Sequence, residues 1–141
     1  MFRALHCPKE TGEQMNRKKA RELAMQCFFQ MEAQKEFNTG SAEAFLKEYT
    51  TGGQEDYLKS VVESFCNNRE EIDQLLNKNS KGWPVDRMAK TDLAISRLAV
   101  TEILFCHDIP KAVAINEAVE LAKVYGTEQS SKFINAILKN I

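Results

Sequence analysis

Apolar residues recur every three or four positions along most of the chain, the spacing that is typical of amphipathic helices. Between residues 16 and 36 this stripe comprises Ala20, Leu23, Ala24, Cys27, Phe28 and Met31. A second stripe follows the loop at 50–53 and comprises Tyr57, Leu58, Val61, Val62, Phe65 and Cys66. The two stripes predict two long helices, with a short helix capped by Ser41 between them.

The helical pattern continues after residue 66. Asn68 and Glu71 are spaced as a capping pair, which predicts a separate helix carrying Ile72, Leu75 and Leu76. A polar loop at 77–82 follows, and Trp83 and Pro84 come directly after it. At this loop the chain can turn from one group of helices to another.

The stretch from Thr91 to Phe105 is apolar nearly all round, which predicts a central, buried helix. Two further helices are expected at 113–125, ended by Gly126 in the left-handed capping position, and at 127–141. No segment shows the strict alternation of a half-buried strand. The sequence therefore predicts an all-α fold of about six or seven helices.

Composition agrees with one globular domain. The chain has 141 residues, of which 43% are hydrophobic and 28% charged, and its six glycines and three prolines are too few for a β-sandwich. The 19 basic and 20 acidic residues nearly balance, so any nucleic-acid site must be a local patch. No signal peptide and no apolar run long enough for a membrane helix is evident, which favours a cytoplasmic protein without membrane contact.

The first 14 residues show no periodicity and differ sharply from the helical segment that begins near Met15. We expect residues 1–14 to be a flexible N-terminal extension and residues 15–141 to form the domain. The sequence leaves open whether Met1 or Met15 is the true start of the protein.

Candidate catalytic and metal-binding residues are few. Three cysteines fall in phase with apolar helical stripes, where a free thiol behaves as a small hydrophobe: Cys27, Cys66 and Cys106. The doublets at 6–7 (His-Cys) and 106–107 (Cys-His) offer a zinc site as an alternative, but they lie a hundred positions apart, whereas zinc ligands usually come in close pairs. Since no phosphate loop, nucleophile elbow or zinc-protease motif is present, we expect no enzyme, no metal and no cofactor.

Four cations lie at the start of the first predicted helix: Arg17, Lys18, Lys19 and Arg21. This placement opposes the helix dipole, which favours acids there, while the free N–H groups of a helix start suit phosphate. Arg17, Lys18 and Arg21 are expected to project from one side, next to the apolar stripe. The cluster is either a solvated helix end or an RNA-binding patch.

Several polar residues interrupt the apolar pattern of the second half. Arg97 and Glu102 lie within the predicted central helix, where an unpaired buried charge costs several kcal/mol, so each must pair or emerge at a rim. Three more lie near the start of the next helix, where they serve either capping and the helix dipole or a partner-facing surface: Asn116, Glu117 and Glu120.

Several motifs closely resemble the bacterial transcription antitermination factor NusB family. The most specific runs from Val113 to Lys123 (VAINEAVELAK), preceded by Ile109-Pro110 and followed by Tyr125-Gly126 and by SKFIN at 131–135. Weaker support comes from Trp83, Asp92, Ile95, Arg97-Leu98-Ala99, Glu102, Ala20-Arg21-Glu22 and Gln26. The resemblance covers residues 15–141.

The resemblance implies two small helical bundles and no catalysis. It also implies binding of the boxA element of nascent single-stranded RNA together with NusE, a small-subunit ribosomal protein. This assembly supports antitermination by RNA polymerase, notably on ribosomal RNA operons, and relatives occur as monomers and homodimers. The alternative is a protein-only helical adaptor that binds a ribosomal protein without specific RNA recognition.

The resemblance also implies roles for particular residues. Its RNA-binding positions correspond to Arg17, Lys18, Lys19, Arg21, Phe29, Gln129, Lys132 and Phe133. Cations of this kind track the RNA backbone, and an aromatic ring offers a base a stacking face. Phe133 also leads an apolar run, so it is either a core residue or a stacking platform. Positions at the ribosomal-protein interface correspond to Asp92 and Lys111, and Asp92 also suits the dipole of its own helix.

Overall fold

The computed structural model describes residues 15–49 and 51–141. These residues form six α-helices and one short 3₁₀ helix, with no strand among them: α1 Arg17–Gln34, α2 Thr39–Leu46, α3 Glu55–Asn79, η1 Val85–Arg87, α4 Lys90–Phe105, α5 Lys111–Tyr125 and α6 Ser130–Leu138. The predicted all-α fold is confirmed. None of the described helices is long and apolar enough to cross a membrane. The expected extension at 1–14, with the His-Cys doublet at 6–7, lies outside the described residues.

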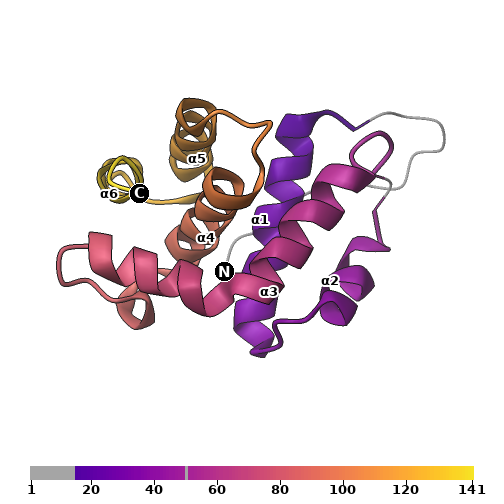
Figure 1. The fold of residues 1–141 in the computed structure, drawn as a ribbon, viewed down its shortest axis with the longest axis horizontal. Coiled ribbons are helices and arrows are strands. Elements are labelled where there is room, and N and C mark those ends of the chain that lie inside the picture. Colours follow the sequence, from indigo (N-terminus) through magenta and orange to yellow (C-terminus); the bar gives the residue numbers. More distant parts are fainter. Residues whose placement is uncertain (1–14, 50) are drawn as a thin grey trace.

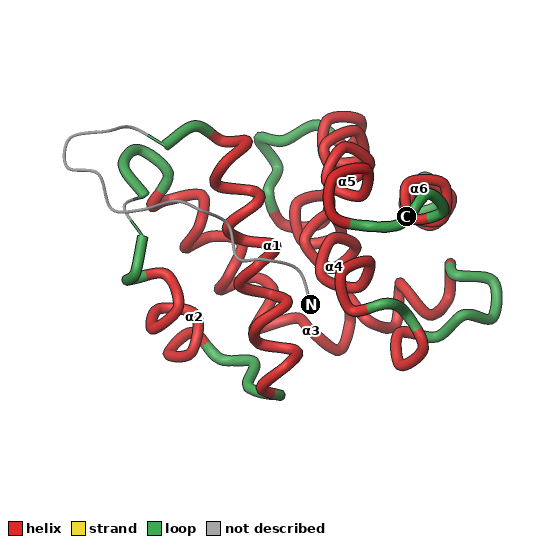
Figure 2. The backbone as a smooth tube through the Cα atoms, turned by 180° about the vertical axis from the view of Figure 1, so that it is seen from behind, coloured by secondary structure: helices red, strands yellow, loops and turns green. Residues whose placement is uncertain are grey.

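Helix α4 is the centre of the molecule, as its sequence predicts. It packs against α1, α3, α5 and α6, and every residue from Asp92 to Glu102 is buried. Figures 1 and 2 show α1, α2 and the first half of α3 on one side of α4, with α5 and α6 on the other. The part of α3 beyond its kink, the loop that follows it and α4 lead the chain from one group to the other (Figure 1), and the two groups share one continuous hydrophobic core. Within it, the rings of Phe28 and Phe65 stack with their centroids 4.3 Å apart.

Helix α3 is broken at residue 68, where the sequence predicts the start of a separate helix. Asn68 has a φ of −131° and a ψ of 22°, which are not helical, so two helical segments meet there at a kink. The Asn68 side chain does not cap a new helix; its Nδ2 donates instead to the carbonyl of Ser64 at 2.8 Å. That bond stabilises the bent backbone, and the part of α3 beyond the bend buries Ile72 and Leu76 in the core.

Two predicted helix ends also differ in detail. Helix α2 is capped by Asn38 rather than Ser41, because the Asn38 Oδ1 accepts from the Ser41 N–H at 2.8 Å. Gly126 ends α5 with a φ of −100°, so it is not in the left-handed region. A glycine fits there for another reason: an added Cβ would lie 2.5 Å from the Ser130 side chain and 2.8 Å from the Ala122 carbonyl oxygen.

The three cysteines of the helices are free thiols within or beside the core. Cys27 and Cys106 are buried, and Cys66 is half-buried. Burial raises the pKa of Cys27 to about 12 and also raises the pKa values of the other two thiols. All three are therefore protonated at neutral pH, which confirms that they behave as small apolar side chains.

Candidate nucleic-acid interface

The start of α1 forms a basic surface, and hydrogen bonds and a cation–ring contact hold its backbone and the Arg17 side chain in place. Asn16 caps the helix by accepting the Lys19 N–H at 2.8 Å, and the first turn contains no acid. Lys18 and Lys19 are exposed, whereas Arg17 is half-buried. The Arg17 Nε donates to Gln54 Oε1 at 2.7 Å, and the guanidinium lies 4.2 Å from the centre of the Tyr57 ring. Three cations thus lie at the start of a helix whose first turn has no acid, an arrangement that attracts anions.

Arg21 does not belong to this surface, so the prediction that it projects beside Arg17 and Lys18 is wrong. It is only 7% exposed, and its Nε donates to Glu102 Oε2 at 2.9 Å. Glu102 also accepts the Tyr57 hydroxyl, which ties α1, α3 and α4 together. Burial alone would lower the pKa of Arg21, but the hydrogen bond to Glu102 and the charge of that carboxylate outweigh it and raise the pKa. Arg21 is therefore a charged core residue.

The exposed face of α1 beyond its basic start leads to the loop before α6. Lys18, Glu22 and Phe29 lie on one face of the helix because they are spaced four and seven residues apart. The Tyr125 hydroxyl at the end of α5 donates to Glu22 Oε2 at 2.7 Å, and Lys19 Nζ lies 3.8 Å from Glu22 Oε1. The negative charge in the middle of this face is thus partly compensated, and Tyr125 brings the 126–129 loop beside it.

The predicted RNA-contact residues of α6 lie at its first turn. Gln129 and Lys132 are exposed, whereas Phe133 is half-buried and packs against the edge of the core. Phe29 on α1 is likewise half-buried against the core. Each ring is therefore partly exposed at the surface while it packs against the core. We name the surface formed by Arg17, Lys18, Lys19, Phe29, Gln129, Lys132 and Phe133 the α1–α6 strip.

The structure separates the two predicted protein-interface residues. Asp92, in the first turn of α4, is only 9% exposed; burial raises its pKa, and a hydrogen bond with Ser130 partly offsets this rise. Lys111 begins α5 and is exposed, and its Nζ donates to the Ile141 carbonyl at 2.8 Å. Because α5 begins just after α4 ends, the two residues lie at opposite ends of α4, about 20 Å apart at 1.5 Å per residue.

Polar residues near the start of α5 do not cap it. Its N-cap is Pro110, without a side-chain hydrogen bond. Glu117 faces the core ion pair instead, with Oε1 3.9 Å from Arg21 Nη1, and Glu120 pairs with Lys123 at 3.2 Å. Asn116 is exposed and lines a groove of about 520 Å³ between α5 and α6, together with Lys132 of the α1–α6 strip.

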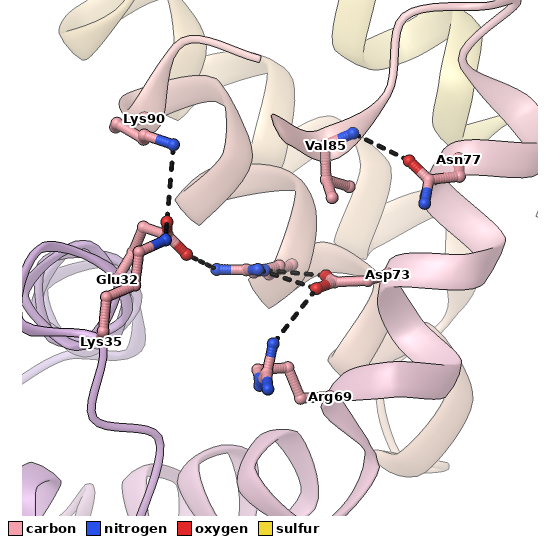
Figure 3. Close-up of polar contacts among 8 residues, drawn as sticks. Glu32, Lys35, Arg69, Asp73, Asn77, Val85 and Lys90 are labelled. Carbon is pink, nitrogen blue, oxygen red and sulfur yellow. Dashed lines mark hydrogen bonds and ion pairs between the residues drawn. The ribbon is translucent and has the colours of Figure 1, made fainter. Parts of the chain in front are cut away.

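Arg97 of α4, like Glu102, confirms the expectation that a buried charge must pair. Arg97 is 3% exposed and forms three hydrogen bonds: Nε and Nη2 donate to the two Asp73 oxygens at 2.9 and 2.8 Å, and Nη1 donates to Glu32 Oε1 at 2.8 Å. Figure 3 shows Glu32 on α1 and Asp73 on α3 pointing toward each other. Glu32 also pairs with Lys35 and, at 3.5 Å, with Lys90. This cluster fixes α1 and α3 against α4.

Two residues beside the basic surface were missed in the sequence. Tyr57 falls in phase with the apolar stripe of α3 and is indeed buried, so nothing in its spacing signals that its ring lies beneath Arg17. Gln54 precedes α3 in a polar loop and is 37 positions from Arg17. Pairings over such distances follow from the packing of α1 against α3, which helical periodicity alone does not provide.

Comparison with known proteins places the chain among similar sequences. The family model described as the NusB family matches residues 18–141. The transcription antitermination protein NusB of Listeria monocytogenes serotype 4a is 42% identical over 127 residues, which cover 90% of this chain and 96% of that protein. The protein of the same name from Acetivibrio thermocellus is 44% identical over 128 residues, which cover 90% and 88%.

Solved structures match the fold over a similar span. T. maritima NusB aligns with a TM-score of 0.80 at 33% identity, over 91% of this chain and 91% of that one. A crystal structure of the antitermination factors NusB and NusE in complex with dsRNA contains a chain that aligns with a TM-score of 0.76 at 26% identity, over 88% and 93%. The arrangement of the described helices is thus a known one.

Proposed function

Since the chain belongs to the NusB family, we propose that it is a transcription antitermination factor that binds boxA RNA together with the ribosomal protein NusE. The observation that carries the proposal is the α1–α6 strip, in which Lys18 lies on the same face of α1 as the half-buried Phe29, and the Tyr125–Glu22 hydrogen bond joins that face to the end of α5, just before α6. This combination suits single-stranded RNA, whose phosphates attract the cations and whose bases stack on rings. The relative crystallised with NusE and dsRNA adds support.

Within this proposal, Arg17, Lys18, Lys19 and Lys132 contact phosphates, and Phe29 and Phe133 contact bases. Gln129 lies at the start of α6, where its exposed amide is placed to donate to RNA. Asp92 and Lys111 contact NusE, and Asp92 does so from the first turn of α4. The factor acts as part of an RNA polymerase antitermination complex in the cytoplasm, without catalysis of its own. Arg21 is removed from the RNA contacts because its guanidinium is buried against Glu102.

The charge of the strip gives a direct prediction. Changing Arg17, Lys18 and Lys19 together to Ala removes up to three phosphate contacts, each of which contributes about 0.7 to the slope of log affinity against log salt on single strands. We expect the slope for boxA RNA to become shallower by about 2. Fluorescence anisotropy titrations between 50 and 200 mM salt measure it.

A matched control removes three exposed lysines, one directly after α2 and two on α3: Lys47, Lys59 and Lys78. This control changes the net charge by the same amount but leaves the strip intact, so we expect the wild-type slope. Equal slopes for the wild type and both triple variants would exclude the start of α1 as the RNA-binding surface.

A protein-only adaptor is the second candidate. Two observations favour it: Arg21 is withdrawn into the core, and Glu22 places a carboxylate on the strip. An adaptor of this kind would bind NusE but would not prefer boxA to a scrambled RNA of the same length. The same titrations, made with and without NusE, therefore separate the two functions.

A further inference from the structure

The Arg17 side chain is held in one orientation by two different contacts. Its Nε donates to Gln54 Oε1 at 2.7 Å, and its Cζ lies over the Tyr57 ring, 4.2 Å from the ring centre, so two separate contacts hold the guanidinium. Among the described residues, neither Nη group donates a hydrogen bond to another side chain or carbonyl; Nε alone donates. The Met15 N–H donates to the Gly52 carbonyl at 2.8 Å and ties the chain just before α1 to the same loop.

The Tyr57 ring is itself fixed at its other end. The residue is 6% exposed, and its hydroxyl donates to Glu102, which is 1% exposed and also binds Arg21. Arg17 at the surface is thus connected through Tyr57 to a buried charged pair. A ring in this position cannot tilt without breaking a buried hydrogen bond, so it is a rigid platform for the cation above it.

We propose that Gln54 and Tyr57 are positioning residues for an RNA phosphate, and that they present the two Nη groups of Arg17 for a bidentate contact. This inference rests on the proposed RNA-binding function. An arginine whose Nε is already bonded keeps two parallel donors on its outer side, and these match two phosphate oxygens. Because Gln54 and Tyr57 already order the side chain, less conformational entropy is lost when RNA binds.

The same geometry distinguishes Arg17 from its neighbours. Lys18 and Lys19 supply point charges on flexible stems, and Lys19 is already partly engaged by Glu22. A lysine at position 17 cannot bond Gln54, lie flat on Tyr57 and contact a phosphate at once. Arg17→Lys should therefore weaken RNA binding nearly as much as Arg17→Ala, although the charge is retained.

The test uses Gln54→Met, which keeps the length of the side chain but removes the oxygen that accepts from Arg17. We expect boxA RNA to bind about three- to tenfold more weakly, with the salt slope shallower by up to about 0.7. In an Arg17→Ala background the same change should have no further effect. Gln74→Met, an exposed site elsewhere on α3, is the matched control and should leave the affinity unchanged.

Tyr57 is tested with a pair of variants. Tyr57→Leu removes the platform and should weaken binding about as much as Gln54→Met. Tyr57→Phe keeps the ring and should restore affinity to within about twofold when measured well below its melting temperature. If Tyr57 acted only in folding, the loss of RNA affinity would depend on the hydroxyl that binds Glu102. Both Tyr57 variants lack that hydroxyl, so both would then bind RNA more weakly.

Each outcome of these titrations decides the proposal. Loss of affinity from Gln54→Met that persists unchanged in the Arg17→Ala background, or no loss at all, would overturn the positioning role. Scrambled RNA carries the same phosphates, so the coupling between the two positions should be present there too. Coupling without a preference for boxA contradicts the proposed function alone, whereas a boxA preference without coupling contradicts the positioning role alone.

Discussion

Replacing Glu102 with Gln should lower the free energy of unfolding by about 3–5 kcal/mol, because the buried guanidinium of Arg21 then keeps only the more distant carboxylate of Glu117 as a counter-charge. Arg21 is 8% exposed at its side chain and Glu102 is 2% exposed, so water cannot replace the lost partner. Glu117 lies 3.9 Å from Arg21 Nη1, too far for a strong hydrogen bond. Urea unfolding measures the change, and the melting temperature should fall by about 10–15 °C.

Two further variants show whether the loss comes from the buried charge. Glu63→Gln makes the same chemical change at an exposed site of α3 and should alter stability by less than about 0.5 kcal/mol. Arg21→Met combined with Glu102→Gln removes the uncompensated cation and should recover part of the loss. If Glu102→Gln costs no more than Glu63→Gln, the assignment of Arg21 to a buried ion pair is wrong.

Arg97→Met should destabilise the protein by about 3 kcal/mol or more, because Glu32 and Asp73 would face each other without the guanidinium between them. Glu32 is 7% exposed at its side chain and Asp73 is 14% exposed. The remaining cations at this cluster are more exposed and replace Arg97 only in part: Lys35, Arg69 and Lys90. Arg87→Met, at an exposed arginine of η1, is the control and should have little effect.

The same variant should change how stability depends on pH. Burial alone would raise the pKa of Glu32, but the hydrogen bonds from Lys35 and Arg97 outweigh it and lower the pKa from 4.5 to about 2. Because the folded pKa lies below the unfolded one, the carboxylate stabilises the fold above about pH 4.5, and this contribution is lost as the pH falls toward 2. Without Arg97 the pKa of Glu32 is lowered less, so the loss over this range should be smaller. If Arg97→Met lost as much stability as the wild type when the pH falls over this range, the ion pair between Arg97 and Glu32 would be contradicted.

Helical periodicity predicted the elements of this fold well because most helices have one continuous apolar face and α4 is apolar nearly all round. It also predicted that Arg97 and Glu102 must find partners. It did not identify those partners, because Glu32 is 65 positions from Arg97 and Arg21 is 81 positions from Glu102. Partners so distant in sequence depend on how helices cross, and side-chain spacing within one helix contains no information on that.

Residues at the boundary between apolar and polar faces were the hardest to place. Arg21 follows Ala20 at the edge of the α1 stripe, and its charge predicts a surface position. The packing of α4 against α1 instead places Glu102 opposite Arg21 and allows the guanidinium to be buried. At Asn68 a capping pattern and a kink look alike, because in both cases the asparagine side chain bonds nearby backbone. The proposed roles of Phe29, Gln129 and Phe133 came from the family resemblance and not from the pattern.

The measurement that tests the central claim most directly is fluorescence anisotropy of a labelled boxA RNA titrated with this protein, with and without NusE, against a scrambled RNA of the same length. The account predicts tighter binding of boxA than of the scrambled RNA, further tightening of boxA binding by NusE, and weaker binding of both RNAs when Arg17, Lys18 and Lys19 are changed to Ala. Equal binding of the two RNAs in the presence of NusE would contradict it and would leave a protein-binding module with a generic basic patch.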